Sequence, residues 1–130
     1  MSGTSSYVLG RLGEEYAAQY LKENGFFIAA RNYRSQRGEI DIIAENRETL
    51  LFVEVKLRKS GSSYSPQEAV TFDKKQRLLH AAKNFIFRSH TTLQPRFDVI
   101  EIIVNERNDL KDADVNWIKN AFGVKGNEFI

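Results

Sequence analysis

The sequence contains no cysteine, which excludes disulfide bonds, thiolate zinc sites and a cysteine nucleophile. It has no apolar run near the roughly 20 residues that a membrane-spanning helix requires. The first residues, Met1 to Ser6, lack the basic and apolar regions of a secretion signal. The absence of cysteine also suits a reducing compartment. We therefore expect a soluble, cytoplasmic protein that does not bind membranes.

The chain has 130 residues, 42% of them hydrophobic, which predicts a single globular domain over residues 1–130. Hydrophobic spacing and turn residues predict an α/β order of helix, three strands, helix and one or two further strands. A capping signal at 65–68 marks the expected start of the second helix, with a break at Thr71. The expected helices cover 6–24 and 65–86, and the expected strands cover 26–33, 39–44, 49–57, 95–104 and 113–121.

Positive charge is concentrated in the middle of the chain. Residues 56–96 contain nine basic and two acidic side chains, whereas residues 101–130 contain four basic and six acidic ones. Such an asymmetry is typical of a surface that faces a polyanion such as nucleic acid. A lysine-rich helix that is merely solvated would give the same composition, so charge alone leaves both interpretations open.

Two charged residues interrupt a predicted strand that is otherwise apolar enough to be buried. Glu54 and Lys56 share one face of this strand, because side chains alternate along it. The preceding strand is joined to it by a short turn, so the two should form an antiparallel hairpin. If the turn lies at 47–48, Asp41 faces Glu54 and Glu39 faces Lys56.

Opposed carboxylates at Asp41 and Glu54 would repel each other unless a cation lay between them. Oxygen ligands of this kind suit Mg²⁺ or Mn²⁺. Lys56 would point to the same place, where its ammonium group could stabilise charge that develops on a scissile phosphate. A simpler interpretation remains open, in which Glu39 and Lys56 form an exposed cross-strand ion pair and Asp41 is solvated.

These residues also carry a resemblance to a known nuclease signature. Asp41, separated by twelve residues from Glu54-Val55-Lys56, resembles the PD-(D/E)xK motif, although Ile40 stands where that motif has proline. The chain is further similar to the bacterial YraN family (UPF0102) over most of its length. The segments that carry this similarity are Gly13-Glu14 to Tyr20-Leu21, Asn32-Tyr33-Arg34, Gly38-Glu39-Ile40-Asp41, Phe52 to Lys56, Ala69-Val70, Lys74 to Arg77 and Arg96-Phe97-Asp98-Val99.

The resemblance implies a restriction-endonuclease-like three-layer fold, with a central mixed β-sheet flanked by helices, similar to archaeal Holliday-junction resolvases. The metal ligands that it implies are Asp41, Glu54, the backbone carbonyl of Val55, and Glu14 on the first helix. The catalytic residues that it implies are Asp41, Glu54, Lys56 and Gln76. By the same resemblance to junction resolvases, a homodimer is expected.

The leading hypothesis is a Mg²⁺- or Mn²⁺-dependent endonuclease that hydrolyses phosphodiester bonds in branched or otherwise structured DNA. The first alternative is a non-catalytic nucleic-acid-binding module that keeps the nuclease fold, because a fold alone does not fix function. A third hypothesis is an interaction domain with a structural ion pair. The residues expected to contact nucleic acid, or else to form an ordinary solvated surface, are Arg34, Arg37, Arg58, Lys74, Lys75 and Arg77.

Overall fold

The structure is a computed structural model that describes residues 6–61, 70–105, 110–125 and 128–129. Its elements in chain order are α1 (Ser6–Glu23), β1 (Phe27–Arg34), β2 (Glu39–Glu45), β3 (Thr49–Lys59), α2 (Phe72–Ser89), β4 (Gln94–Val104), β5 (Asp114–Ile118), β6 (Val124–Lys125) and β7 (Glu128–Phe129).

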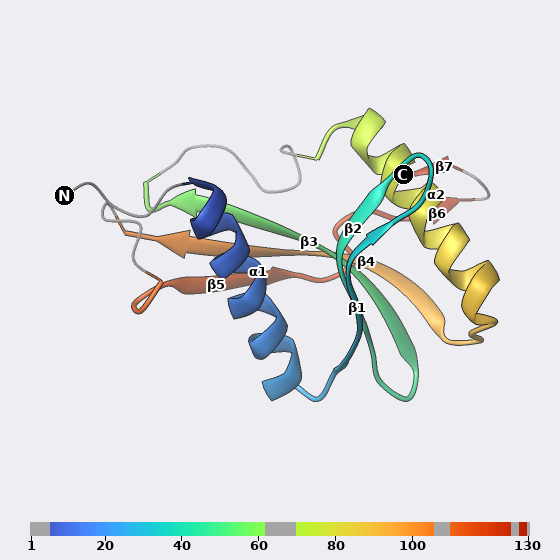
Figure 1. The fold of residues 1–130 in the computed structure, drawn as a ribbon, viewed down its shortest axis with the longest axis horizontal. Coiled ribbons are helices and arrows are strands. Elements are labelled where there is room, and N and C mark those ends of the chain that lie inside the picture. Colours follow the sequence, from blue (N-terminus) through green and yellow to red (C-terminus); the bar gives the residue numbers. More distant parts are fainter. Residues whose placement is uncertain (1–5, 62–69, 106–109, 126–127, 130) are drawn as a thin grey trace.

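The centre of the fold is a five-stranded sheet with the order β1-β2-β3-β4-β5. The strands β3 and β4 are parallel and the other neighbours are antiparallel, so the sheet is mixed. These two long strands lie side by side in the middle of the sheet (Figure 1). The helix α2 belongs to the crossover between them, as a parallel pair requires. The predicted α/β order of elements is confirmed.

The two helices cover opposite faces of the sheet. Leu21 of α1 belongs to a buried cluster with Ile42 and Val53, whereas Leu78 of α2 belongs to a second buried cluster with Ile43. Because neighbouring residues of a strand point to opposite faces, Ile42 and Ile43 place the clusters on opposite sides of β2. The layers are therefore α1, sheet and α2, which agrees with the three-layer restriction-endonuclease-like fold that was predicted.

The ends of the helices follow from local sequence. Gly25, with φ of 89°, follows the end of α1 in a conformation that L residues rarely adopt. The hydroxyl of Thr71 caps α2 by accepting a hydrogen bond from the backbone N–H of Lys74 at 3.2 Å. Thr71 is also the position at which the sequence predicts a break. The predicted capping signal at 65–68 lies outside the described residues.

Several features differ from the sequence-based prediction. The described residues 70–71 are not helical, so α2 begins at Phe72, and it continues to Ser89, beyond the predicted end at residue 86. β3 continues to Lys59, beyond the predicted end at residue 57, so Arg58 lies in this strand. β5 ends at Ile118, short of the predicted residue 121. The pair β6–β7 was not predicted, because strands of two residues are too short to show alternation. Within the described ranges, no helix is long and apolar enough to cross a membrane.

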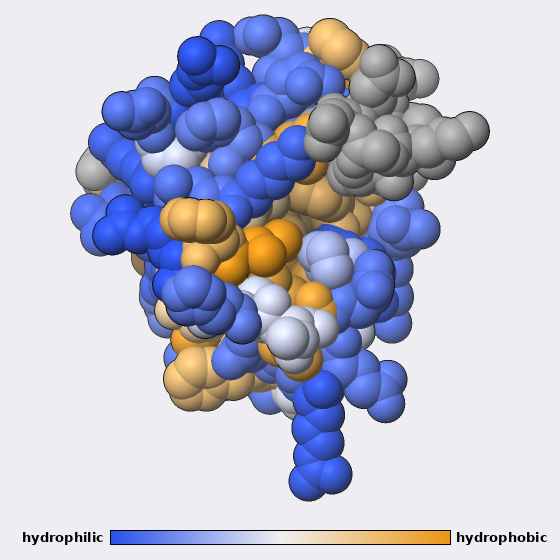
Figure 2. Space-filling view, turned by 90° about the vertical axis from the view of Figure 1, so that its right-hand side faces the viewer, coloured by the Kyte–Doolittle hydropathy of each residue, from blue (hydrophilic) through white to orange (hydrophobic). Residues whose placement is uncertain are grey.

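The surface on the side of α2 is mixed in character. Two large apolar side chains of α2 are exposed there, Phe72 and Phe87. Figure 2 shows apolar side chains gathered in the middle of this side of the molecule, with hydrophilic ones around them. Apolar areas with polar rims are typical of contact surfaces, but the expected homodimer remains a prediction.

Candidate active site

The register of β2 and β3 is the one predicted from the short turn. Ile42 lies opposite Val53, and Glu45 lies opposite Leu50. The ladder ends at Ile42, and the side chain of the preceding residue, Asp41, turns to β3. There its Oδ2 accepts a hydrogen bond from the backbone N–H of Val55 at 2.9 Å. This bond replaces a rung of the ladder and holds the Asp41 carboxylate at the end of the paired region.

Glu54 is the buried partner of Asp41. Its side chain lies on the α2 face of β3 and the residue is only 4% exposed. Burial, the charge of Asp41 and a hydrogen bond with Asp41 together raise the pKa of the Glu54 carboxyl group from 4.5 to about 8. Lys74 and Lys56 act in the opposite direction but do not compensate. The hydrogen bond with Asp41 means that the two carboxyl groups lie within hydrogen-bonding reach of each other.

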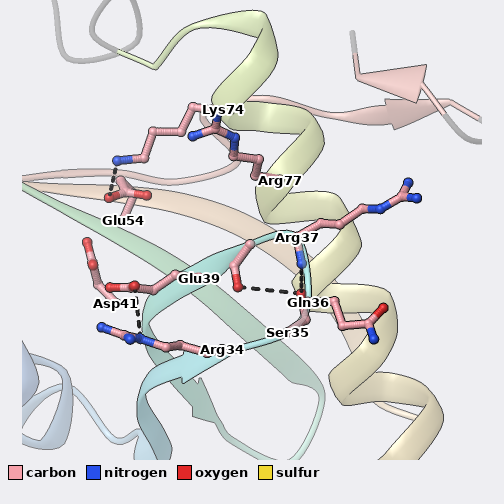
Figure 3. A pocket seen from close by; sticks show the side chains of 10 residues that line it. Arg34, Ser35, Gln36, Arg37, Glu39, Asp41, Glu54, Lys74 and Arg77 are labelled. Carbon is pink, nitrogen blue, oxygen red and sulfur yellow. Dashed lines mark hydrogen bonds and ion pairs between the residues drawn. The ribbon is translucent and has the colours of Figure 1, made fainter.

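Two lysines complete a cluster of four charged groups. The Nζ atom of Lys74 lies 3.2 Å from Oε1 of Glu54, and Figure 3 shows Lys74 reaching from α2 to this carboxylate. Burial lowers the pKa of Lys56, and the charge of Lys74 adds to this effect while Glu54 opposes it. Burial would also lower the pKa of Lys74, but its interactions with Glu54 outweigh burial and raise it. The ammonium groups of Lys56 and Lys74 are thus close to each other and to the acidic pair.

The acidic pair opens into a cavity with a volume of about 550 Å³. Four basic side chains contribute to its walls, one from the end of β1, one from the β1–β2 connection and two from α2. One of them, Arg34, pairs with Glu39 at 3.2 Å. The residues that line this cavity are Arg34, Ser35, Gln36, Arg37, Gly38, Glu39, Asp41, Glu54, Lys74 and Arg77 (Figure 3). An acidic pair beneath basic walls can hold a cation and a phosphate side by side.

The β1–β2 connection is fixed tightly against α2. A Cβ atom on Gly38 would lie only 2.0 Å from the backbone oxygen of Arg77, so no larger residue fits there without movement of the backbone. Oγ of Ser35 lies 2.8 Å from Nδ1 of His80. The hydroxyl group of Tyr33 also hydrogen-bonds to the side chain of Asn84. Ser35 and Gly38 line the cavity, so these contacts hold that part of its wall against α2.

A second cavity, of about 680 Å³, lies beside the first and shares Arg37 and Arg77 with it. Gln76 lines this second cavity and not the one that contains Asp41 and Glu54. The complete lining is Arg37, Asp73, Gln76, Arg77, Leu79, His80 and Lys83. The predicted catalytic role of Gln76 therefore remains a prediction, for a side chain one cavity away from the acidic pair.

Glu14 lies on α1 and lines a third cavity together with Arg34 and Glu39. Burial raises the pKa of Glu14, and the negative charge of Asp41 adds to the effect. Glu14 is thus near enough to Asp41 to interact with it electrostatically. Within the described residues, no three His, Cys, Asp or Glu side chains are grouped closely enough to hold a metal ion. The expected role of Glu14 as a ligand stays a prediction.

The predicted nucleic-acid contacts divide into two groups. Arg34, Arg37, Lys74 and Arg77 line the first cavity. Arg58 is engaged elsewhere, because its Nε donates to the buried Glu101 at 2.6 Å. Lys75 is also directed elsewhere, with Nζ 5.4 Å from the centre of the Phe122 ring. A phosphate-binding surface at the acidic pair would thus include four of the six predicted residues.

The simpler interpretation of the strand pair does not hold. Glu39 pairs with Arg34, and Lys56 interacts with Glu54 and Lys74 instead of with Glu39. Two features of the site had no signal in the sequence, the Lys74–Glu54 ion pair and the Ser35–His80 contact, and the steric reason for glycine at 38 had none either. Each depends on where α2 packs against the hairpin.

The chemistry of the donor set fits a hard divalent cation. Asp41 and Glu54 supply only carboxylate oxygens. Mg²⁺ prefers oxygen ligands and is often held by one or two carboxylates. The carboxyl group of Glu54 is buried beside a second acid, which raises its pKa to about 8. A cation between the carboxylates of Asp41 and Glu54 would reduce the electrostatic repulsion between them.

Comparison with known proteins agrees with the motifs. The sequence profile of Uncharacterised protein family UPF0102 matches residues 13–102. A UPF0102 protein of Caldicellulosiruptor saccharolyticus is 44% identical over 115 residues, which cover 88% of this chain and 96% of that protein. A UPF0102 protein of Clostridium botulinum is 42% identical over 118 residues, which cover 89% and 94%. The family resemblance predicted from the sequence is therefore confirmed, and this chain belongs to the UPF0102 family.

Proposed function

We propose that the protein is a Mg²⁺- or Mn²⁺-dependent endonuclease that hydrolyses phosphodiester bonds in DNA, with branched or otherwise structured DNA as the preferred substrate. One observation carries the proposal. The carboxyl groups of Asp41 and Glu54 lie together at a cavity with four basic side chains in its walls, and Lys56 interacts with the same pair. Metal-dependent hydrolysis of a phosphodiester needs acidic groups to hold the metal ion and basic groups to bind the phosphate, both at one place.

Asp41 and Glu54 would hold the metal ion, and the resemblance adds the carbonyl of Val55 and the carboxylate of Glu14. Mg²⁺ or Mn²⁺ supplies Lewis-acid chemistry, which activates water and polarises a phosphoryl oxygen. The hydrogen bond from the Val55 N–H orients the carboxylate of Asp41 before any ligand arrives. Such preorganisation limits the reorganisation needed at the moment of reaction.

Lys56 is the proposed catalytic lysine. It is half-buried, and burial lowers its pKa. In a partly dehydrated site its ammonium group would donate a hydrogen bond to a non-bridging oxygen of the scissile phosphate. Charge that develops there in the transition state would be stabilised more strongly than the same charge in water.

The basic walls would hold the strand in register with the acidic pair. Arg34 ends β1, Arg37 lies in the β1–β2 connection, and Arg77 comes from α2. Contacts of this kind bind phosphates and position the strand without reading its sequence. They support a preference for the shape of a nucleic acid over its base sequence. A homodimer, implied by the resemblance to junction resolvases, would present two such cavities to one DNA molecule.

The Lys74–Glu54 ion pair favours a second candidate, a non-catalytic nucleic-acid-binding module. In that case the ammonium group of Lys74 would be the permanent partner of Glu54, and no metal ion would enter. Such a protein would bind DNA with strong salt dependence but without turnover.

The test is cleavage of a panel of end-labelled linear, flap and four-way DNA, with RNA of matching structure, in Mg²⁺, Mn²⁺ or EDTA. We expect metal-dependent cleavage that is lost in Asp41→Asn and in Lys56→Ala. Arg47→Ala is the matched control, because this exposed cation lies in the turn at the opposite end of the β2–β3 hairpin. Cleavage that persists unchanged in both site variants would remove this site from the mechanism. Binding without cleavage in every metal would support the second candidate.

A further inference from the structure

The contact of Lys74 with Glu54 is a feature of the site that the proposed mechanism does not use. Its side chain begins in the first turn of α2, where the Thr71 cap fixes the backbone. Its ammonium group pairs with a Glu54 side chain that is 5% exposed, while the Lys74 side chain itself is 41% exposed. The carboxyl group of Glu54 is therefore buried, whereas the ammonium group of Lys74 reaches it from the side that is open to solvent.

Counting charges shows what a metal ion would change. When Asp41 and Glu54 are both ionised, the cluster carries two negative charges, and Lys56 and Lys74 carry two positive ones. A divalent ion between the carboxylates would replace both ammonium groups as their partner. The cluster would then carry an excess of two positive charges, and like charges at short range are destabilising.

A bound DNA strand supplies the missing anions. Each phosphodiester carries one negative charge, and the cavity that contains Lys74 also contains Arg77, one helical turn away on the same face of α2. Lysine has a flexible stem of four methylene groups and three donors, so its ammonium group can change partner without movement of the helix. Lys74 is also more exposed than Glu54, so it can leave the pair at a lower desolvation cost.

We propose that Lys74 couples metal binding to DNA binding: its ammonium group pairs with Glu54 when the metal is absent and transfers to a backbone phosphate when the metal and the strand are bound. The proposal rests on the proposed function, because it needs a divalent ion at Asp41 and Glu54. Binding of the metal ion then favours binding of DNA, because the phosphates neutralise the excess positive charge that the metal ion creates. Binding of DNA likewise favours binding of the metal ion, because the ammonium group of Lys74 is held by a phosphate and no longer repels the ion. By thermodynamic linkage, DNA must raise the affinity for the metal ion by the same factor by which the metal ion raises the affinity for DNA.

The experiment measures Mn²⁺ affinity by calorimetry, with free Mn²⁺ followed in parallel by electron paramagnetic resonance. The proteins are wild type, Lys74→Met, Lys74→Arg and Lys22→Met. Methionine keeps the length and helix propensity of lysine without its charge. Lys22→Met is the matched control, since it removes the same charge from an exposed helical position. Each titration is done alone and with a short phosphorothioate DNA strand that resists cleavage.

Without DNA, Lys74→Met should bind Mn²⁺ about tenfold more tightly than wild type, within the range usual for coupled sites. With DNA, wild type should gain affinity by a similar factor, whereas Lys74→Met should gain little. Lys74→Arg keeps the ion pair and should behave like wild type, as should Lys22→Met. Thermal unfolding of each variant checks that the fold is intact.

Equal Mn²⁺ affinity in wild type and Lys74→Met, with binding lost in Asp41→Asn, would overturn this proposal and leave the proposed function standing. The coupling is equally overturned if DNA raises the Mn²⁺ affinity of Lys74→Met as much as that of wild type. If none of the proteins binds Mn²⁺, both proposals fall.

Discussion

Glu54→Gln is expected to stabilise the metal-free protein at neutral and alkaline pH. Burial and the adjacent Asp41 raise the pKa of the Glu54 carboxyl group from 4.5 to about 8. An unfolded chain keeps the ordinary value, so between these pH values the folded state retains a proton that the unfolded state has released. The contribution of this group to the free energy of unfolding therefore falls as pH rises from 4.5 through about 8.

The size of the effect follows from that shift. One pKa unit corresponds to about 1.4 kcal/mol. The change from 4.5 to about 8 thus sets an upper limit of about 5 kcal/mol on the destabilisation by ionised Glu54. The limit is upper because the shift arises from interactions that Glu54 shares with neighbouring charged groups, so it does not belong to Glu54 alone. Glutamine is neutral at every pH, and its amide can still donate a hydrogen bond to Asp41.

Urea unfolding in EDTA, from about pH 5 to about pH 9, measures the difference between wild type and Glu54→Gln. The two proteins should be similar in stability near pH 5. The variant should become more stable by several kcal/mol near pH 9, while titrating groups that do not interact with Glu54 cancel in the difference. Glu48→Gln, at an exposed position in the β2–β3 turn, controls for loss of a negative charge. Curves for wild type and Glu54→Gln that stay parallel across this range would refute the reasoning.

Three further predictions follow from the same contacts. Gly38→Ala should destabilise the protein by about 1–3 kcal/mol in urea unfolding and reduce DNA affinity, because its Cβ would lie 2.0 Å from the backbone oxygen of Arg77; a stability within error of wild type would contradict the packing. Lys56→Ala should lower the rate of DNA cleavage by at least 10²-fold while Mn²⁺ binding persists, which single-turnover assays and calorimetry can separate. Arg37→Ala should weaken DNA binding and reduce the slope of log affinity against log salt by about one, as measured by fluorescence anisotropy; an unchanged slope would exclude a phosphate contact.

The strand pair at the centre of the site could be predicted because its determinants are local. A turn near residues 47–48 fixes the register of β2 and β3, and the observed pairing of Ile42 with Val53 is the predicted one. Alternation then brings Asp41 and Glu54 to adjoining positions.

The partners that α2 supplies could not be predicted, because they depend on how the helix packs on the sheet. Lys74 lies twenty residues from Glu54 in sequence. If α2 were rotated about its axis by one residue, the same lysine would be an ordinary solvated cation. The contact between Ser35 and His80 spans 45 positions, and His80 carries no spacing signal of its own. Hydrophobic periodicity identifies the buried face of a helix, but it does not give the position of the helix along the strands on which it packs.

The partner of Arg58 was also missed. The predicted strand ends at residue 57, but β3 continues to Lys59 and brings Arg58 to Glu101 of the parallel strand, while its predicted nucleic-acid contact stays a prediction. Glu101 is 1% exposed, so its charge needs a partner within the protein. A buried acid on a neighbouring strand could have signalled this pairing, because β3 and β4 were both predicted as strands.

The most direct test of the account is anomalous diffraction at the manganese edge from crystals soaked in Mn²⁺. The account predicts a peak between the carboxylates of Asp41 and Glu54, with the ammonium group of Lys74 withdrawn from Glu54. No peak at this position, in crystals where Lys74 still pairs with Glu54, would contradict it.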